Sequence, residues 1–358
     1  MVYHLILSTA VLSSAGGVVV DEAAHESIEN LSIYERFYTD FDISYTRVYR
    51  DLSPLPDPFV IVESKDEDRF VQQGNKYHFE HKSIRKGYNG VVTDYEYYTA
   101  FDGKTTKISA PGHVNVHEDP VADMYRFRAH NVLCPTPRLV ALSEWLIDPA
   151  ITRRTKNPEY DYSVSFGARE IVEGEDCVKL IVQYRRKKKI RTSYEVWLSV
   201  HKSYLPVQMK CFEASTSETH PQYVAVVKEF QELSDGVWFP KFAESKSYDR
   251  VLLRKGVLKE KLYESFTLNS LTSTSHPDSF FRTIKTPPQY IEYIFKNGKI
   301  IKSQVHADQN TGPLKSGPGL MVAAIACTTI VILYFGIYRR NTRHIKDACS
   351  ADKPMCII

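Results

Sequence analysis

The stretch Val178-Lys-Leu-Ile-Val-Gln-Tyr184 decides the fold class. Apolar side chains stand at every second position from Val178 to Tyr184, which is the period of a β-strand with one buried face and one wet face. The flanking stretches 160–166 and 194–200 repeat this alternation. Three alternating segments in succession predict antiparallel strands joined by short turns.

Turn signals and composition extend this prediction to most of the chain. Glycine-containing turn sequences stand at strand-length intervals, at 73–75, 102–103, 173–175, 235–236 and 255–256. The chain also has 23 tyrosines and 17 phenylalanines, residues that favour strands. With 358 residues and 43% hydrophobic residues, it is long and apolar enough to form a packed core. We therefore expect a mainly β fold of the α+β type.

Two segments have helical rather than strand periodicity. Residues 26–39 carry apolar side chains at helical spacing from Ile28 to Tyr38, and residues 137–148 place Leu142 and Trp145 on one helical face. Pro137 suits the first turn of this second helix. We expect a large antiparallel sheet that curls around one or two helices, because both apolar surfaces are then buried.

The segment from Leu320 to Tyr338 contains no charged residue. Its nineteen residues, at ~1.5 Å each, give a helix of ~28 Å, close to the thickness of the hydrocarbon core of a bilayer. Basic residues, beginning with Arg339 and Arg340, are more frequent after this segment than before it. By the positive-inside rule, the short tail is cytoplasmic and the large domain is exported.

Export requires a signal, and residues 5–20 have the length and small-residue ending of a signal peptide, although no Lys or Arg precedes them. A cytosolic domain with a tail anchor is the alternative, but it conflicts with the charge rule. The predicted organisation is a signal peptide at 1–24, an extracytoplasmic β domain at 25–302, a Gly/Pro-containing stalk at 303–319, a transmembrane helix at 320–338 and a basic tail at 339–358.

The charge balance and the cysteines exclude some classes of protein. The 46 Lys+Arg and 43 Asp+Glu give a net charge of +3, so no overall field indicates nucleic-acid binding. The six cysteines form no C-x-x-C pair and no disulfide-rich framework. Cys177 and Cys211 lie in neighbouring strand patterns, where they form either a disulfide or two buried thiols.

Three sequence elements resemble the LolA/LolB-type lipoprotein carrier superfamily. They are Trp197-Leu-Ser-Val-His-Lys-Ser-Tyr-Leu-Pro-Val-Gln-Met209, Asp235-Gly-Val-Trp-Phe-Pro-Lys241 and Pro277-Asp-Ser-Phe-Phe281. The resemblance covers about Glu26 to Lys302, and the chain departs from it at Ser199, where an acidic residue is usual.

The resemblance implies a half-open antiparallel β-barrel, closed by helices, with an apolar cavity for acyl chains or lipidated proteins. Members of this superfamily are carriers or envelope-stress sensors and not enzymes. The expected cavity residues are Trp145, Leu142, Trp197, Trp238 and Phe239. A C-terminal anchor favours a tethered carrier or sensor over a diffusing shuttle.

Pro240 lacks a backbone N–H donor, so a sheet edge or a bulge is expected next to Trp238 and Phe239. Trp238 and Phe239 are adjacent in a strand and are expected to point to opposite faces.

Two other patterns favour simple structural explanations. His113 and His117, followed by Glu118 and Asp119, form a weak candidate for a divalent metal site, and no cofactor is expected. The basic run 185–191 predicts a solvated hairpin tip, with attraction to anionic lipid headgroups as the alternative.

The chain contains no nucleophile elbow, Walker loop, zinc-protease helix or dinucleotide fingerprint, so we expect no enzyme. The leading hypothesis is a single-pass membrane protein whose exported domain binds a lipid, an acyl chain or a lipidated protein. The alternative is a non-catalytic interaction domain of the cell envelope with a filled barrel and a protein partner. An exported hydrolase is a third possibility, because convergent catalytic sets assemble only in the fold.

Overall fold

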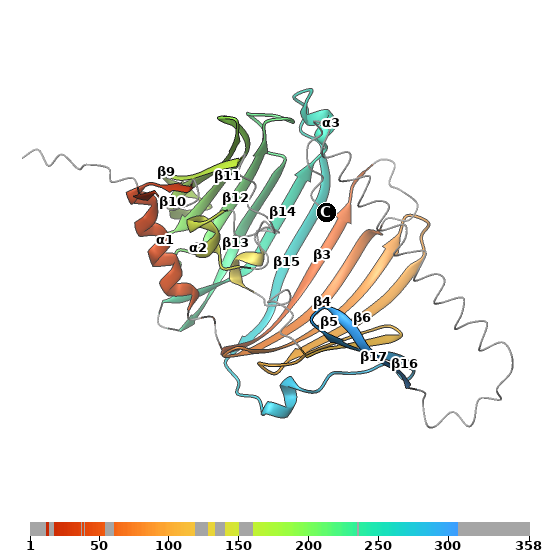
Figure 1. The fold of residues 1–358 in the computed structure, drawn as a ribbon. Helices are drawn as coiled ribbons and strands as arrows, with labels where there is room; N and C mark the ends of the chain where they lie inside the picture. The colour runs from red at the N-terminus through yellow and green to blue at the C-terminus, as the bar shows by residue number, and fades with distance from the viewer. Residues whose placement is uncertain are drawn as a thin grey trace, which may run out of the picture. The chain divides into compact units, whose positions relative to one another are not determined.

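The computed structural model describes residues 12–13, 18–36, 38, 40–53, 61–118, 128–132, 140–149, 160–234 and 236–306. Within these ranges the chain forms one large curved open sheet with few helices (Figure 1). The mainly β prediction is therefore confirmed.

Seventeen strands form this sheet. They are β1 Leu12–Ser13, β2 Val18–Val20, β3 Asp40–Asp51, β4 Ile61–Gln73, β5 Lys76–Gly87, β6 Val92–Phe101, β7 Thr106–Ala110, β8 His113–His117, β9 Tyr160–Val172, β10 Glu175–Arg186, β11 Lys189–Ser199, β12 Pro206–Glu213, β13 Tyr223–Ser234, β14 Val237–Tyr248, β15 Glu260–Thr272, β16 Tyr290–Lys296 and β17 Lys299–His306. The helical elements are α1 Glu22–Glu35, η1 Ala129–Val132, α2 Leu142–Ile147, α3 Arg250–Leu253 and η2 Asp278–Phe281.

Two antiparallel runs, β3 to β8 and β9 to β15, join through the pairing of β15 with β3. β2 adds to β9 and β16 adds to β8, both in parallel. The sheet is therefore open, and its outermost described strands are β1 and β17. The prediction of a large curved sheet is confirmed, and two parallel pairings add to its otherwise antiparallel order.

The predicted turns connect the strands as expected. The glycine in each of the five turn sequences has a positive φ, a conformation that costs glycine little. The basic run forms the tip of the β10–β11 hairpin, where Lys187 and Lys188 have φ of 51° and 65°. Two consecutive positive φ values are typical of the type I′ turn that matches strand twist.

The first helix begins earlier than predicted because Asp21 caps it. The Asp21 carboxylate accepts a hydrogen bond from the Ala24 backbone N–H at 2.7 Å, and α1 then runs to Glu35 rather than to residue 39. β2 pairs with β9 and Ala24 is fully buried, so the packed structure begins before the predicted boundary at residue 25. The rest of the predicted signal peptide lies largely outside the described residues and stays a prediction.

The second helix is shorter than predicted. Val140 and Ala141 are not helical, so α2 begins at Leu142 rather than near Pro137, which lies outside the described residues. The Glu35 side chain of α1 supplies the missing cap. Its carboxylate accepts hydrogen bonds from the backbone N–H of Leu142 at 2.8 Å and of Ser143 at 3.2 Å.

The predicted stalk and transmembrane helix lie almost entirely outside the described residues. In the part of the chain that the structure describes, no helix is both long and apolar enough to span a bilayer. The membrane span at 320–338 stays a prediction.

Candidate functional site

The face of the sheet on which α1 and α2 pack, here called the inner face, has two different halves. The helix-packed half lies over β9 to β12, where both helices rest on the sheet (Figure 1). The graded half lies over β3 to β6, away from α1 and α2 (Figure 1). An aromatic cluster lies between the two halves, with Phe239 on β14, Phe266 on β15, Phe41 on β3 and Phe70 on β4.

Trp145 is the centre of the helix-packed half. Its side chain is 0% exposed, its ring packs edge-on against Tyr194 at 5.4 Å, and its indole N–H donates to the Tyr184 hydroxyl at 3.1 Å. Tyr184 in turn donates to the Pro149 carbonyl at 3.3 Å. Side chains of α1 and α2 therefore fill this half, and the polar atoms of its two central rings are satisfied by each other and by the Pro149 carbonyl.

In the graded half, residues in register form four rows across β3, β4, β5 and β6. The rows, in order, are Phe41–Gln72–Tyr77–Phe101, Ile43–Phe70–Phe79–Thr99, Tyr45–Asp68–His81–Tyr97 and Arg47–Asp66–Ser83–Tyr95. The first two rows are mainly aromatic and aliphatic, and the last two carry the charges. One face of the same four strands thus changes from apolar to polar over the length of the strands.

Asp68 is the centre of the charged rows. Its carboxylate is fully buried, lies 2.6 Å from Nδ1 of His81, and accepts from Arg47, whose Nη2 is 2.9 Å away. Burial is the largest single influence and lowers the pKa of Arg47, but Asp68, Tyr45 and the nearby acidic side chains together outweigh it, so the pKa is raised. Burial also raises the pKa of Tyr45 far above its ordinary value. Arg47 stays charged and Tyr45 stays neutral at physiological pH.

The outermost row reaches solvent. Arg47 and Tyr95 are half-buried, and the Arg85 guanidinium lies over the Tyr95 ring at 4.3 Å from its centroid. Ser83 donates to Asp66 at 2.6 Å. This end of the graded half presents cationic and aromatic groups next to a buried aromatic floor.

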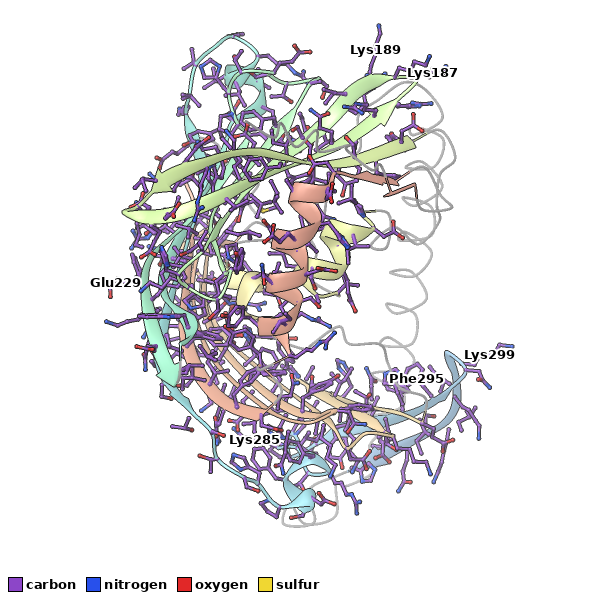
Figure 2. The ribbon with its side chains drawn as sticks, turned by 90° about the vertical axis from the view of Figure 1, so that its left-hand side faces the viewer. Lys187, Lys189, Glu229, Lys285, Phe295 and Lys299 are labelled. Atoms are coloured by element: carbon purple, nitrogen blue, oxygen red, sulfur yellow. The ribbon has the colours of Figure 1, made fainter. Side chains whose placement is uncertain are left out.

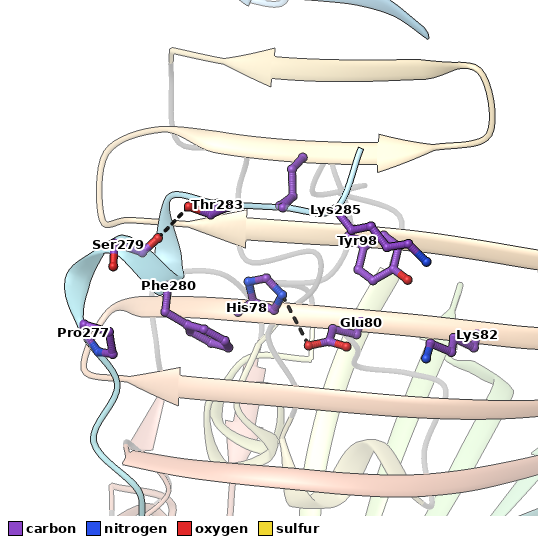
Figure 3. A pocket seen from close by; sticks show the side chains of 10 residues that line it. His78, Glu80, Lys82, Tyr98, Pro277, Ser279, Phe280, Thr283 and Lys285 are labelled. Carbon is purple, nitrogen blue, oxygen red and sulfur yellow. Dashed lines mark hydrogen bonds and ion pairs between the residues drawn. The ribbon is translucent and has the colours of Figure 1, made fainter. Parts of the chain in front are cut away.

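A separate groove lies on the opposite, outer face, where the segment after β15 crosses β5 and β6 (Figure 3). The groove is open, has a volume of about 610 Å³, and includes His78, Glu80, Lys82, Tyr98, Phe280 and Lys285 in its wall. Its wall mixes charged side chains with the apolar surface of Tyr98, Phe280 and Ile284, and the groove is open, so it differs from the predicted apolar barrel cavity.

Phe280 anchors the crossing segment in this groove. Its ring packs between those of His78 and His276, each at 4.5 Å. Ion pairs of Asp278 with Lys76 and of Lys285 with Glu96 hold the segment at either side.

The five predicted cavity residues lie in three separate clusters. Trp145 and Leu142 are in the helix-packed half, and Phe239 is in the central aromatic cluster with Trp238 at its margin. Trp197 lies with Cys177 and Val207 in a third cluster. None of the five lines the outer groove.

Pro240 lies at a bulge, because the register of β14 with β13 shifts next to it. On the other side of β14, the pairing with β15 begins only at Phe242. Phe239 is 1% exposed, whereas Trp238 is half-buried under the Lys202 ammonium, 3.2 Å from its ring centroid. The prediction of a bulge is confirmed, and only one of the two aromatics is fully buried.

The structure also shows where the candidate metal-binding histidines and the two strand cysteines lie. His78 faces the outer groove and His81 the inner face. His117 stacks on Phe295 at 4.6 Å. Within the described residues, no three His, Cys, Asp or Glu side chains converge as metal ligands, and Asp119 lies outside these residues. Cys177 and Cys211 are free buried thiols, and burial raises their pKa to about 12 and about 11.

The sequence reasoning did not find Arg47, Asp68, His81 or Arg85. One signal was available: period-two alternation in 61–73 places Asp66 and Asp68 on the same face as Phe70. Polar residues on a predicted core face indicate a buried polar cluster.

Comparison with solved structures gives several similar chains, among them the following two. One is described as an outer membrane lipoprotein-sorting protein domain from Vibrio parahaemolyticus, with 10% identity, a TM-score of 0.38, and coverage of 72% of this chain and 95% of that one. The other is the enduracididine biosynthesis enzyme MppR, with 9% identity, a TM-score of 0.11, and coverage of 65% and 87%. No family model and no curated protein matches the sequence.

Proposed function

We propose that this protein is a membrane-anchored extracytoplasmic domain that binds an amphiphile on the graded half of its inner face. The ligand class is a lipid, an acyl chain or a lipidated protein, and the domain acts as a tethered carrier or sensor and not as an enzyme. The observation that carries the proposal is the change from aromatic rows to charged rows along β3 to β6. To bind an amphiphile, a site needs an apolar surface for the chain and a polar surface for the headgroup, both within the length of one ligand molecule.

The chemistry of the charged rows supports binding rather than hydrolysis. The Asp68–His81 pair has the geometry of a catalytic dyad, but Nε2 of His81 faces the Arg85 guanidinium at 3.5 Å and not a hydroxyl. Ser83 is engaged with Asp66 instead. Arg47 and Arg85 are suited to an anionic headgroup.

The test uses the full chain, purified in a mild detergent. Native mass spectrometry should detect a co-purified lipid or acylated peptide, and a fluorescent fatty acid should bind after delipidation. Arg85→Ala should weaken fatty-acid binding about tenfold, which corresponds to one lost charge-assisted hydrogen bond.

Lys82→Ala is the matched control, because Lys82 lies on the same strand but faces the outer groove. Equal effects of the two substitutions, or a chain that neither carries nor binds an amphiphile, would overturn the proposal.

The alternative is an interaction domain with a filled interior. It is favoured by one observation: α1 and α2 leave Trp145, Leu142 and Ile28 essentially without exposed surface in the helix-packed half. Crosslinking in the native membrane should then recover a stoichiometric protein partner, and Arg85→Ala should leave this partner bound.

A further inference from the structure

Two projecting tips at one end of the sheet are strongly basic. Six of the seven residues from 185 to 191, at the β10–β11 tip, are Lys or Arg. Residues 249–261, which connect β14 to β15 through α3, contain five Lys or Arg and two acidic residues. These two segments together are called the basic rim.

Both tips have a defined backbone structure held by local contacts. The β10–β11 tip is closed by the tight turn at Lys187 and Lys188. The other tip begins with the Asp249 carboxylate, which accepts from the backbone N–H groups of Val251 and Leu252 at 2.9 Å each. Leu253, at 1% exposure, anchors this tip to the domain.

The two tips flank the same strand end. The Ala214 backbone N–H, just after β12, donates to the Arg191 carbonyl at 3.0 Å. Glu213, the last residue of β12, pairs with Arg250 at 3.2 Å. Figure 1 shows the ends of β11 and β12 and the α3 tip along one rim, and Figure 2 shows Lys187 and Lys189 projecting from it. The basic rim is therefore one surface.

The positive charge of the rim is largely uncompensated. In the described part of the chain, no carboxylate pairs with Lys187, Lys188, Lys189, Arg254 or Lys255. Several acidic groups nearby are already engaged: Asp249 is a helix cap, Glu260 pairs with Lys246, and Glu213 pairs with Arg250. The others lie beside the rim: Asp161 opposite Arg185, Asp51 opposite Leu262, and Glu218 in the β12–β13 loop.

The opposite ends of the same strands have the reverse sign. Residues 170–176 contain four acidic and no basic residues, and residues 229–236 contain three acidic and no basic residues.

Apolar side chains stand exposed among these cations. Val251 is 61% exposed, Leu258 52%, Val257 50% and Ile190 41%. Interleaved apolar and basic side chains are typical of surfaces that insert into the headgroup region of a bilayer, whereas a nucleic-acid surface needs no exposed aliphatic groups. We infer that the basic rim docks on the anionic surface of the membrane that carries the protein.

The chain length permits this contact. Thirteen residues, 307–319, separate the end of β17 from the predicted span. When extended, they reach at most roughly 45 Å, about the length of one long strand of this sheet. The inference does not depend on amphiphile binding. Arg85→Ala should therefore weaken fatty-acid binding and leave docking unchanged.

The experiment places the full chain in nanodiscs of phosphatidylcholine alone or of phosphatidylcholine with phosphatidylglycerol and measures amide hydrogen exchange. Exchange across 186–190 and 251–258 should slow only in the anionic nanodiscs, and added salt should reverse the effect. Arg254→Gln/Lys255→Gln should weaken docking about 25-fold, at about fivefold for each basic side chain near an anionic surface.

Lys104→Gln/Lys241→Gln removes the same charge from exposed sites away from the rim and should have no effect. Lys187→Asn/Lys188→Gly removes charge while keeping a turn-compatible sequence, so loss of docking in this variant cannot come from a strained turn. Equal exchange in the two kinds of nanodisc would overturn the inference. Protection by an acidic peptide such as polyglutamate, without protection by anionic lipid, would also overturn it and indicate a protein partner.

Discussion

The two halves of the inner face use the same strand geometry for different purposes. In the helix-packed half, apolar residues at alternate positions of β9 to β12 form one cluster with α1 and α2, and Trp145 is fully buried in it. In the graded half, the same alternation places Asp66 and Asp68 on the inner face beside Phe70. The comparison teaches that an inward position on this sheet does not imply an apolar residue.

The halves also differ in how their polar groups are satisfied. In the helix-packed half, hydrogen bonds such as that of Glu35 with α2 join one helix to another. In the graded half, side chains of neighbouring strands satisfy each other and leave Arg47 and Tyr95 partly accessible. The first arrangement stabilises the fold, and the second is available for a ligand.

The largest effect is expected from Trp145→Ala. Removing a fully buried tryptophan should lower the free energy of unfolding by about 3–5 kcal/mol, measured by chemical denaturation. Trp145→Phe keeps most of the volume but loses the N–H bond to Tyr184, so its effect should be about 1–2 kcal/mol. Equal losses in both variants would assign the effect to the hydrogen bond and not to the cavity.

Asp68→Asn tests the graded half. It should lower the free energy of unfolding by about 2–3 kcal/mol, because Arg47 loses its buried charged partner. Glu67→Gln is the control, since Glu67 is exposed on the opposite face of the same strand and should change stability little. A loss no larger than that of the control would show that the charged rows do not stabilise the fold.

Glu35→Ala removes the cap that α1 provides for α2. We expect a loss of about 1–2 kcal/mol and faster amide exchange confined to 142–147, because two backbone N–H groups lose their acceptor. Unchanged exchange in α2 would contradict the capping role.

The pH dependence of the same site is the smallest expected effect. Burial raises the pKa of Glu35 above its ordinary value of 4.5, although hydrogen bonds from Ser143 and Leu142 oppose the rise. The folded state therefore holds this proton more tightly, and the resulting stability is complete below pH 4.5 and is lost as the pH rises through the raised pKa.

Glu35→Gln does not titrate, so its stability relative to the parent should improve as the pH rises through this window, as measured by denaturation at a series of pH values. A constant difference between the two proteins would contradict the raised pKa.

The sequence predicted strands better than it predicted helix ends. Alternation over 160–166, 178–184 and 194–200 indicated strands that the structure confirms, because side-chain period is a local property. The start of α2 was wrong because its cap is Glu35, which is distant in sequence. The predicted cavity residues were four large aromatics and Leu142, and large apolar side chains occur both in packed cores and on ligand-binding surfaces.

The sequence by itself determined the strand content, the turns, the basic character of 185–191 and an uncharged segment long enough to span a bilayer. These features depend on neighbours in the chain. Only the tertiary structure decided that Arg47, Asp68 and His81 meet, that Trp145 and Trp197 belong to different clusters, and that two basic tips share one rim. These relations depend on strand register and pairing order, which arise from contacts between residues far apart in the sequence.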